Sequence, residues 1–94
     1  MEFEWDERKN QENIRRHGID FAIGARIFDG PVVRKPDDRR DYGELRYIAF
    51  GSVEQEILAI VYTVRDTGYR IISTRRANRR ERRAYRQVYP EELT

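Results

Sequence analysis

The sequence predicts an α+β protein in which a small antiparallel β-sheet is flanked by helices. Short apolar segments joined by tight turns lie between residues 45 and 75, and helical patterns with capping residues lie on both sides of them. Strands joined by such short links must pair antiparallel. We expect residues 1–94 to form one domain, because a chain of 94 residues is too short for two independent cores.

The first part of the chain is expected to contain one strand and two helices. Residues 3–5 suit a short strand. Asp6 can cap a helix that runs to about His17, where Gly18 can end it. Asp20 can cap a second helix. The expected apolar face of this second helix consists of Phe21, Ala22, Ala25 and Phe28.

Four strands and a last helix are expected in the rest of the chain. Val32 and Val33 suggest a short strand, which Pro36 and a charged turn end. Further strands are predicted at Leu45–Phe50, Ile57–Arg65 and Tyr69–Arg75. The second of these three is apolar on both faces, which favours a central position. The last helix is predicted over about 77–88, with a sheet-facing side made of Ala77, Ala84, Tyr85 and Val88. The predicted order is β-α-α-β-β-β-β-α.

Positive charge is concentrated near the end of the chain. The net charge is only +2, but residues 1–64 carry 10 basic against 13 acidic side chains. Residues 65–86 carry nine Arg against two acidic residues. Arg is suited to bidentate contacts with phosphate and to stacking on bases. This distribution predicts a polyanionic partner.

The composition excludes several classes of protein. Without cysteine the chain has no disulfides and no thiolate metal sites, and no apolar run approaches the roughly 20 residues needed to span a membrane. The acidic start Met1–Trp5 lacks the basic and apolar regions of a signal peptide. The acidic residues at 37–44 match no metal-binding loop, and Arg39 and Arg40 between them oppose cation binding. We therefore expect a cytoplasmic protein without membrane contact, metal or cofactor.

The arginine-rich segment 73–86 is the strongest functional signal. Arginines crowded on one helix repel each other, and only Glu81 can pair with them locally. This pattern favours polyanion binding. The alternative is a solvated helix face whose arginines pair with acidic residues elsewhere in the fold.

Arginines on strands have fixed positions beside the sheet. Arg75 ends the last predicted strand, and Arg46 and Arg65 could lie on the same face of the sheet. Two or three such residues can grip a phosphate and stabilise the charge of a phosphorane transition state. The alternative is that each pairs with a carboxylate such as Asp37 or Glu44.

Proton transfer has two candidate residue types. His17 is the single histidine, which excludes a two-histidine mechanism, and its unperturbed pKa suits one proton transfer. A histidine at the end of a helix also stabilises the helix dipole. Tyr62 is one of four tyrosines around the predicted sheet, which could stack a base, relay a proton or simply pack in the core.

The sequence resembles the BrnT toxin family along nearly its whole length. The resemblance is carried, in order, by Phe3-Glu4-Trp5-Asp6, Asn13–Phe21, Ala25–Asp29, Tyr42–Arg46, Val61-Tyr62-Thr63, Arg70–Ala77 and Arg79–Tyr85. It implies a type II toxin with a RelE-like fold that blocks translation by cutting RNA. It also implies a BrnA-like antitoxin, which pairs with the toxin through its N-terminal part and binds operator DNA through a ribbon-helix-helix.

We expect a metal-independent endoribonuclease in which the RNA 2′-hydroxyl attacks the adjacent phosphate. The expected catalytic residues are Arg46, Arg75, His17, Tyr62 and Glu81. The expected RNA-binding residues are Arg65, Arg70, Arg76, Arg79, Arg80 and Arg83. Two other functions stay open on the sequence: a non-catalytic RNA- or DNA-binding module, and a domain that docks an acidic protein.

Overall fold

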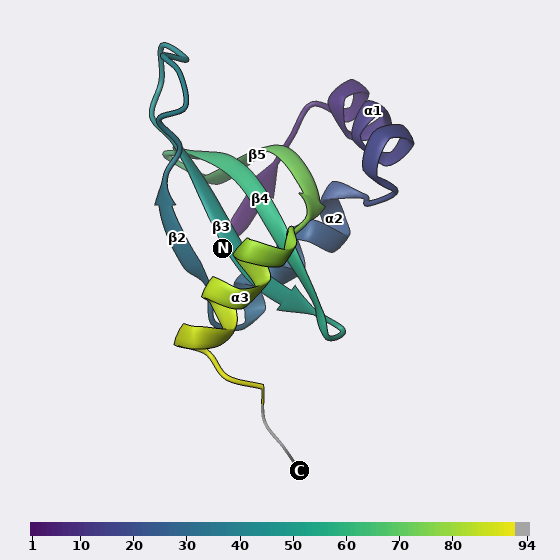
Figure 1. Ribbon diagram of the computed structural model, residues 1–94. Coiled ribbons are helices and arrows are strands. Elements are labelled where there is room, and N and C mark those ends of the chain that lie inside the picture. The colour runs from purple at the N-terminus through teal and green to yellow at the C-terminus, as the bar shows by residue number, and fades with distance from the viewer. Residues whose placement is uncertain (92–94) are drawn as a thin grey trace.

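The computed structural model, described here for residues 1–91, has the predicted fold class and element order. Figure 1 shows the elements: β1 (Glu2–Glu4), α1 (Glu7–His17), α2 (Phe21–Gly24), the 3-10 helix η1 (Ala25–Asp29), β2 (Val33–Pro36), β3 (Arg46–Val53), β4 (Glu56–Arg65), β5 (Gly68–Arg76) and α3 (Arg79–Val88). No helix within this part of the chain is long and apolar enough to cross a membrane.

The five strands form one sheet in the order β1-β5-β4-β3-β2. Strands β2 to β5 pair antiparallel, and β4 is central as predicted. Strand β1 adds a parallel edge to β5, which the sequence did not predict. This edge depends on Gly68, whose φ is +151° and where a Cβ would overlap the Glu2 carbonyl.

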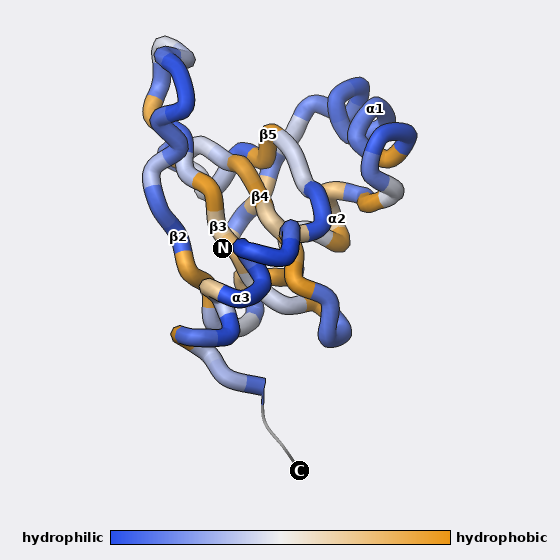
Figure 2. The backbone as a smooth tube through the Cα atoms, in the orientation of Figure 1, coloured by the Kyte–Doolittle hydropathy of each residue, from blue (hydrophilic) through white to orange (hydrophobic). Residues whose placement is uncertain are grey.

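Helices cover the two faces of the sheet unequally. Helices α1, α2 and η1 lie on one face, where Phe21, Ile27 and Ile60 are buried in one core. The single helix α3 packs on the other face, where Tyr85 joins a second core with Phe50. In Figure 1, α3 crosses one end of the sheet and leaves the other end uncovered. Figure 2 shows that α1 and α3 are mostly hydrophilic along their length.

The second predicted helix is shorter than expected. The α-helix ends at Gly24 and continues as a 3-10 helix, which changes the face that points inward. A Cβ at Gly24 would clash with the side chain of Thr74, so only glycine allows this close approach to the sheet. As a result Ile27 is buried and Ala22 is exposed, and the prediction that Ala22 lies on the apolar face was wrong.

The inward face of the last helix also differs from the prediction. Tyr85 is buried as expected, but Ala84 and Val88 are exposed and Tyr89 is partly buried instead. The Tyr85 hydroxyl donates to the Pro31 carbonyl at 2.8 Å, which orients α3 toward the segment before β2.

Helix α1 is attached through buried amides rather than through apolar contacts. Asn13 donates to the Ile19 carbonyl at 2.9 Å and to the Thr74 hydroxyl at 2.7 Å, and its side-chain oxygen accepts from the Thr74 amide at 3.2 Å. The Asn10 side-chain oxygen accepts from the Phe21 amide at 2.9 Å. These bonds satisfy polar groups that the core would otherwise leave unpaired.

Replacing Asn13 with Ala should lower the free energy of unfolding by about 2–3 kcal/mol, because it removes buried hydrogen bonds to Ile19 and Thr74 and leaves the Thr74 amide without its side-chain acceptor. Urea denaturation measures this change. Gln11→Ala on the exposed side of the same helix is the control and should change it by less than about 0.5 kcal/mol. Equal effects of the two substitutions would contradict the role of Asn13.

Candidate active site

Several cationic side chains lie on the sheet face that α3 only partly covers. Arg46 on β3 and Arg70 on β5 both pair with Thr63 on β4, and Arg75 pairs with Ala59. Since Ala59 packs toward α3 and strand residues alternate, all three arginines point to that face. Arg65, two residues beyond Thr63, lies on it too. The expectation that these strand arginines can share one face agrees with this register.

A β-bulge makes this arrangement possible. The register of β5 against β4 shifts between Val61 and Tyr62, which pair with Ser73 and Ile71 and leave Ile72 as the extra residue. Without the extra residue, Arg70 and Arg75 would point to opposite faces because they are five positions apart. The bulge therefore places both arginines on the face of α3.

Arg46 and Arg75 are nevertheless not adjacent on the sheet. Their partners Thr63 and Ala59 are four residues apart on β4. This corresponds to about 13 Å along the strands and about 10 Å across them. The structure therefore does not place the two residues side by side, and their guanidinium groups pair with different acids, Glu44 and Glu81.

Arg75 lies in a hollow between β2, β3, β5 and the start of α3. The hollow has a volume of about 400 Å³ and is lined by Lys35, Pro36, Asp37, Asp38, Arg39, Ile48, Arg75 and Glu81. The Arg75 guanidinium forms two hydrogen bonds with the Glu81 carboxylate, at 2.7 and 2.9 Å. This pairing, which is the main cause of both shifts, raises the pKa of Arg75 and lowers the pKa of Glu81.

Helix α3 fixes Glu81 from its own side. The Asn78 side chain accepts from the Glu81 amide at 2.9 Å, and the Glu81 carboxylate accepts from the Asn78 amide at 2.8 Å. This reciprocal pair is a capping box, which positions Glu81 in the first turn of the helix. The Arg75 guanidinium is thus anchored by a carboxylate that the helix terminus itself holds.

The anchored guanidinium keeps one edge free. Of its five N–H groups, Nη1 donates to Glu81 and to the Arg76 carbonyl, and Nη2 donates once to Glu81. The Nε–H and the second Nη2–H have no partner among residues 1–91. These two bonds run parallel on one edge of the guanidinium, and such a fork matches two oxygens of a phosphate.

Two further cations line this hollow, and the sequence analysis missed them as site residues. Lys35 comes from β2, opposite Ile48. Arg39 forms hydrogen bonds at 2.7 and 2.8 Å with both oxygens of Asp37, which is buried. The Arg39 hydrogen bond lowers the pKa of Asp37. No local signal separates Asp37 from Asp38, because only the pairing of β2 with β3 shows which of them turns inward.

The remaining strand arginines on this face have carboxylate neighbours. Glu44 lies 3.3 Å from Arg46 and 3.5 Å from Arg65, and Glu4 lies 3.6 Å from Arg70. Pairing with an acid such as Glu44 was the alternative interpretation of these residues, and the structure shows it. Partly exposed pairs of this kind contribute little to stability, and two arginines share the single Glu44. The guanidinium groups on this face are therefore only weakly held by their carboxylate neighbours.

His17 and Tyr62 do not lie with these arginines. His17 ends α1 on the opposite side of the sheet, where its carbonyl accepts from Arg76 at 2.8 Å, and Arg76 also pairs with Glu56. Tyr62 is fully buried and its ring stacks on Tyr69, with centroids 4.5 Å apart. Burial raises the pKa of Tyr62. The structure therefore does not bring His17, Tyr62 or Arg76 together with Arg75.

The arginines of α3 differ from those of the strands. Arg79, Arg80 and Arg83 are exposed and have no ion pair within residues 1–91.

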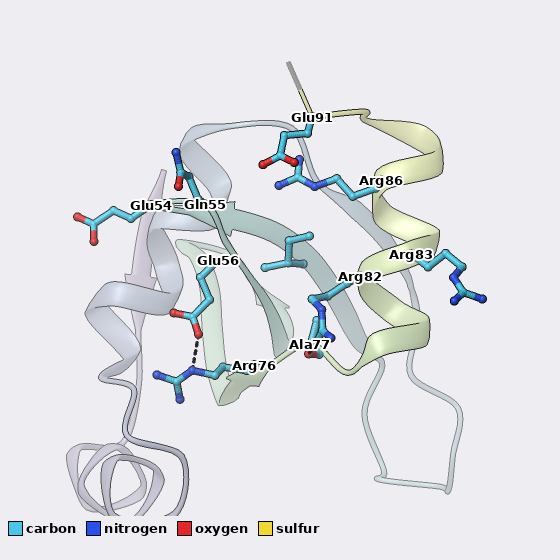
Figure 3. Close-up of a pocket in the computed structure, with 10 residues that line it drawn as sticks. Glu54, Gln55, Glu56, Arg76, Ala77, Arg82, Arg83, Arg86 and Glu91 are labelled. Atoms are coloured by element: carbon cyan, nitrogen blue, oxygen red, sulfur yellow. Dashed lines mark hydrogen bonds and ion pairs between the residues drawn. The ribbon is translucent and has the colours of Figure 1, made fainter. Parts of the chain in front are cut away.

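A larger groove of about 640 Å³ runs between α3 and the β3–β4 turn (Figure 3). Its lining includes Glu54, Glu56 and Glu91 as well as Arg76, Arg82, Arg83 and Arg86. In Figure 3, Arg83 points away from the groove. Arg82 donates to the Ala77 carbonyl at 2.7 Å. The hollow at Arg75 differs from this groove because it holds a guanidinium group that is fixed by a carboxylate and keeps one edge free.

The fold and this site define a small α+β protein with an arginine-rich sheet face and a basic last helix, of which Arg79, Arg80 and Arg83 have no ion pair within residues 1–91. The chain belongs to the BrnT family, since the family model described as "Ribonuclease toxin, BrnT, of type II toxin-antitoxin system" matches residues 5–81. It is therefore a ribonuclease toxin whose partner is an antitoxin. A comparison with curated proteins finds no match.

The ion pair between Glu81 and Arg75 should make the free energy of unfolding depend on pH. Because the pKa of Glu81 is lowered in the folded protein, the stabilisation is complete above the pKa of a free Glu, about 4.3. It is lost as the pH falls below that value through the lowered pKa. Glu81→Gln removes the charge, so urea denaturation should show a constant deficit from pH 7 to 5 that shrinks below about pH 4. A deficit that stays constant down to pH 3 would contradict this assignment.

Proposed function

We propose that this toxin is a metal-independent endoribonuclease that cuts RNA at the Arg75 hollow and thereby inhibits translation. The observation that carries the proposal is the free Nε/Nη2 edge of Arg75, which Glu81 holds in place beside Lys35 and Arg39. A fixed guanidinium fork needs no reorganisation when charge develops on a phosphoryl group, and such preorganised donors supply much of catalysis.

The reaction that fits this hollow is transfer of the phosphoryl group to the neighbouring 2′-oxygen. The 2′-oxygen attacks phosphorus, the bond to the 5′-oxygen breaks, and the products are a 2′,3′-cyclic phosphate and a 5′-hydroxyl. Arg75 holds two phosphoryl oxygens and stabilises their added charge. The 2′ proton passes to the ionised Glu81, and Lys35 supplies a proton to the departing 5′-oxygen. Glu81 is a weak base, so positioning and charge provide most of the rate enhancement.

The chemistry of the hollow supports independence from metal ions. The carboxylates Asp37 and Glu81 each accept two hydrogen bonds from one arginine, Arg39 and Arg75. A divalent cation would have to displace these guanidinium groups and approach Lys35 as well. Two of the three carboxylates that line the hollow are therefore already paired with cations.

The other arginines extend the proposed site along the RNA backbone. Arg46, Arg65 and Arg70 form a second cationic row on the same sheet face, spaced from Arg75 so that they would meet other phosphates of one strand. Arg80 lines the neighbouring small hollow, and Arg79 and Arg83 are exposed on the same helix, where they would add to the attraction for RNA. Arg76 lies outside this path.

We further propose that the antitoxin is a BrnA-like ribbon-helix-helix protein and that operator DNA is bound only through it. The family resemblance supports this partner, and the arginine-rich face offers an acidic antitoxin segment a surface to cover. The toxin itself would act in the cytoplasm, where ribosomes and messenger RNA are present.

Arg75→Ala should reduce RNA cleavage by about 10²–10³-fold, because it removes the fixed donors of the transition state. Arg75→Lys should restore little, since an ammonium group lacks the fork. Arg26→Ala, which removes an exposed arginine on η1, is the control and should leave the rate unchanged. Cleavage rates on a defined RNA give the comparison, and normal activity of Arg75→Ala would exclude this residue from the mechanism.

Cleavage should proceed at an unchanged rate in excess chelator, because no step needs a divalent ion. The 3′ ends of the products should carry cyclic phosphate, which mass spectrometry detects. Cleavage that stops with chelator and returns with Mg²⁺ would refute metal independence. Binding of RNA without any cleavage would instead favour the alternative of a non-catalytic nucleic-acid-binding module.

A further inference from the structure

A small apolar hollow adjoins the proposed phosphate site. It has a volume of about 240 Å³ and lies between β2, β3 and α3, with a lining of Val33, Lys35, Phe50, Arg80, Glu81, Ala84 and Tyr85. It shares Lys35 and Glu81 with the hollow that contains Arg75. The two hollows are therefore neighbouring compartments of one surface.

The register of the sheet shows how the two hollows are aligned. Val33 pairs with Phe50, Phe50 with Ala59 and Ala59 with Arg75, so one row crosses the sheet from the apolar hollow to the guanidinium. Two strand spacings separate Phe50 from Arg75, a distance of about 10 Å. Long side chains on both sides shorten this gap, and a nucleotide can span it with its phosphate at Arg75.

We propose that this apolar hollow is the subsite for the nucleobase that adjoins the scissile phosphate, and that it sets the cleavage preference of the toxin. The inference rests on the proposed function. Phe50 and Tyr85 form an almost fully buried floor, and the more exposed Val33 and Ala84 add apolar surface against which a flat base can pack. Arg80 and Lys35 at its edge present N–H donors to the ring nitrogens and carbonyl oxygens of a base.

The charges around the hollow favour a nucleotide over an apolar protein side chain. An apolar segment of a protein would bury Lys35 and Arg80 without giving them acceptors, which is costly. A nucleotide suits both the apolar lining and the cations, because its base fills the apolar part of the hollow while its phosphate pairs with the cations beside it.

Ala84→Leu offers a test that leaves the core untouched. Ala84 is exposed on α3 and lines the hollow, so a longer side chain should fill the space without disturbing buried residues. Leu is also a good helix former. Gln87→Leu is the matched control, because Gln87 is exposed on the same helix and lines none of the hollows described here. Ala84→Gln provides a second, polar way of filling the hollow.

Binding of the four nucleoside 3′-monophosphates and of inorganic phosphate should be measured for each variant by calorimetry or NMR titration. The wild-type protein should bind at least one nucleotide about tenfold tighter than phosphate, the gain expected from packing a base. Ala84→Leu and Ala84→Gln should lose this gain and keep the affinity for phosphate, while Gln87→Leu should match the wild type.

The proposal is overturned if the wild type binds nucleotides no tighter than phosphate, or if both Ala84 variants keep the difference. The proposed ribonuclease activity is tested separately, by RNA cleavage. A wild-type protein that shows the nucleotide gain but cleaves no RNA would refute the proposed function and leave the base subsite in place. A protein that cleaves RNA without the gain would refute only the subsite.

Discussion

The paired hydrogen bonds between Arg75 and Glu81 are the contact on which the functional surface depends. They join the last strand to the first turn of the last helix, and the capping box of that helix fixes the carboxylate. Because Glu81 takes the Nη1/Nη2 edge of the guanidinium, the adjacent Nε/Nη2 edge is held still and keeps two donors free. A salt bridge that looks purely structural therefore also fixes a guanidinium group with an unused fork in the lining of the hollow.

The distribution of the arginines follows from how little of the sheet α3 covers. The helix buries its aromatic side chains Tyr85 and Tyr89 over one end of the face, and the other end is left to charged residues. Strand arginines there are steadied by acids such as Glu44 and Glu4, whereas Arg79, Arg80 and Arg83 on the helix have no such partners within residues 1–91. The sheet supplies fixed positions, and the helix supplies the excess charge that attracts a polyanion.

Features set by local chemistry could be predicted from the sequence, and features set by register could not. Asp6 and Gly18 delimit α1 as expected, because caps act within a few residues. The parallel pairing of β1, the bulge at Ile72 and the inward turn of Asp37 depend on contacts between distant segments. The placement of Tyr62 was within reach of the sequence, since three positions separate it from Arg65 on one strand and alternation puts them on opposite faces.

The central claim is that the free edge of Arg75 binds a phosphate of the RNA. The most direct measurement follows the Nε–H signal of Arg75 by NMR while an RNA with 2′-O-methyl groups, which cannot be cut, is added. The account predicts a saturable shift and slower solvent exchange of this proton, both weakened by added salt. An Arg75 signal that stays unchanged while those of the α3 arginines shift would contradict it.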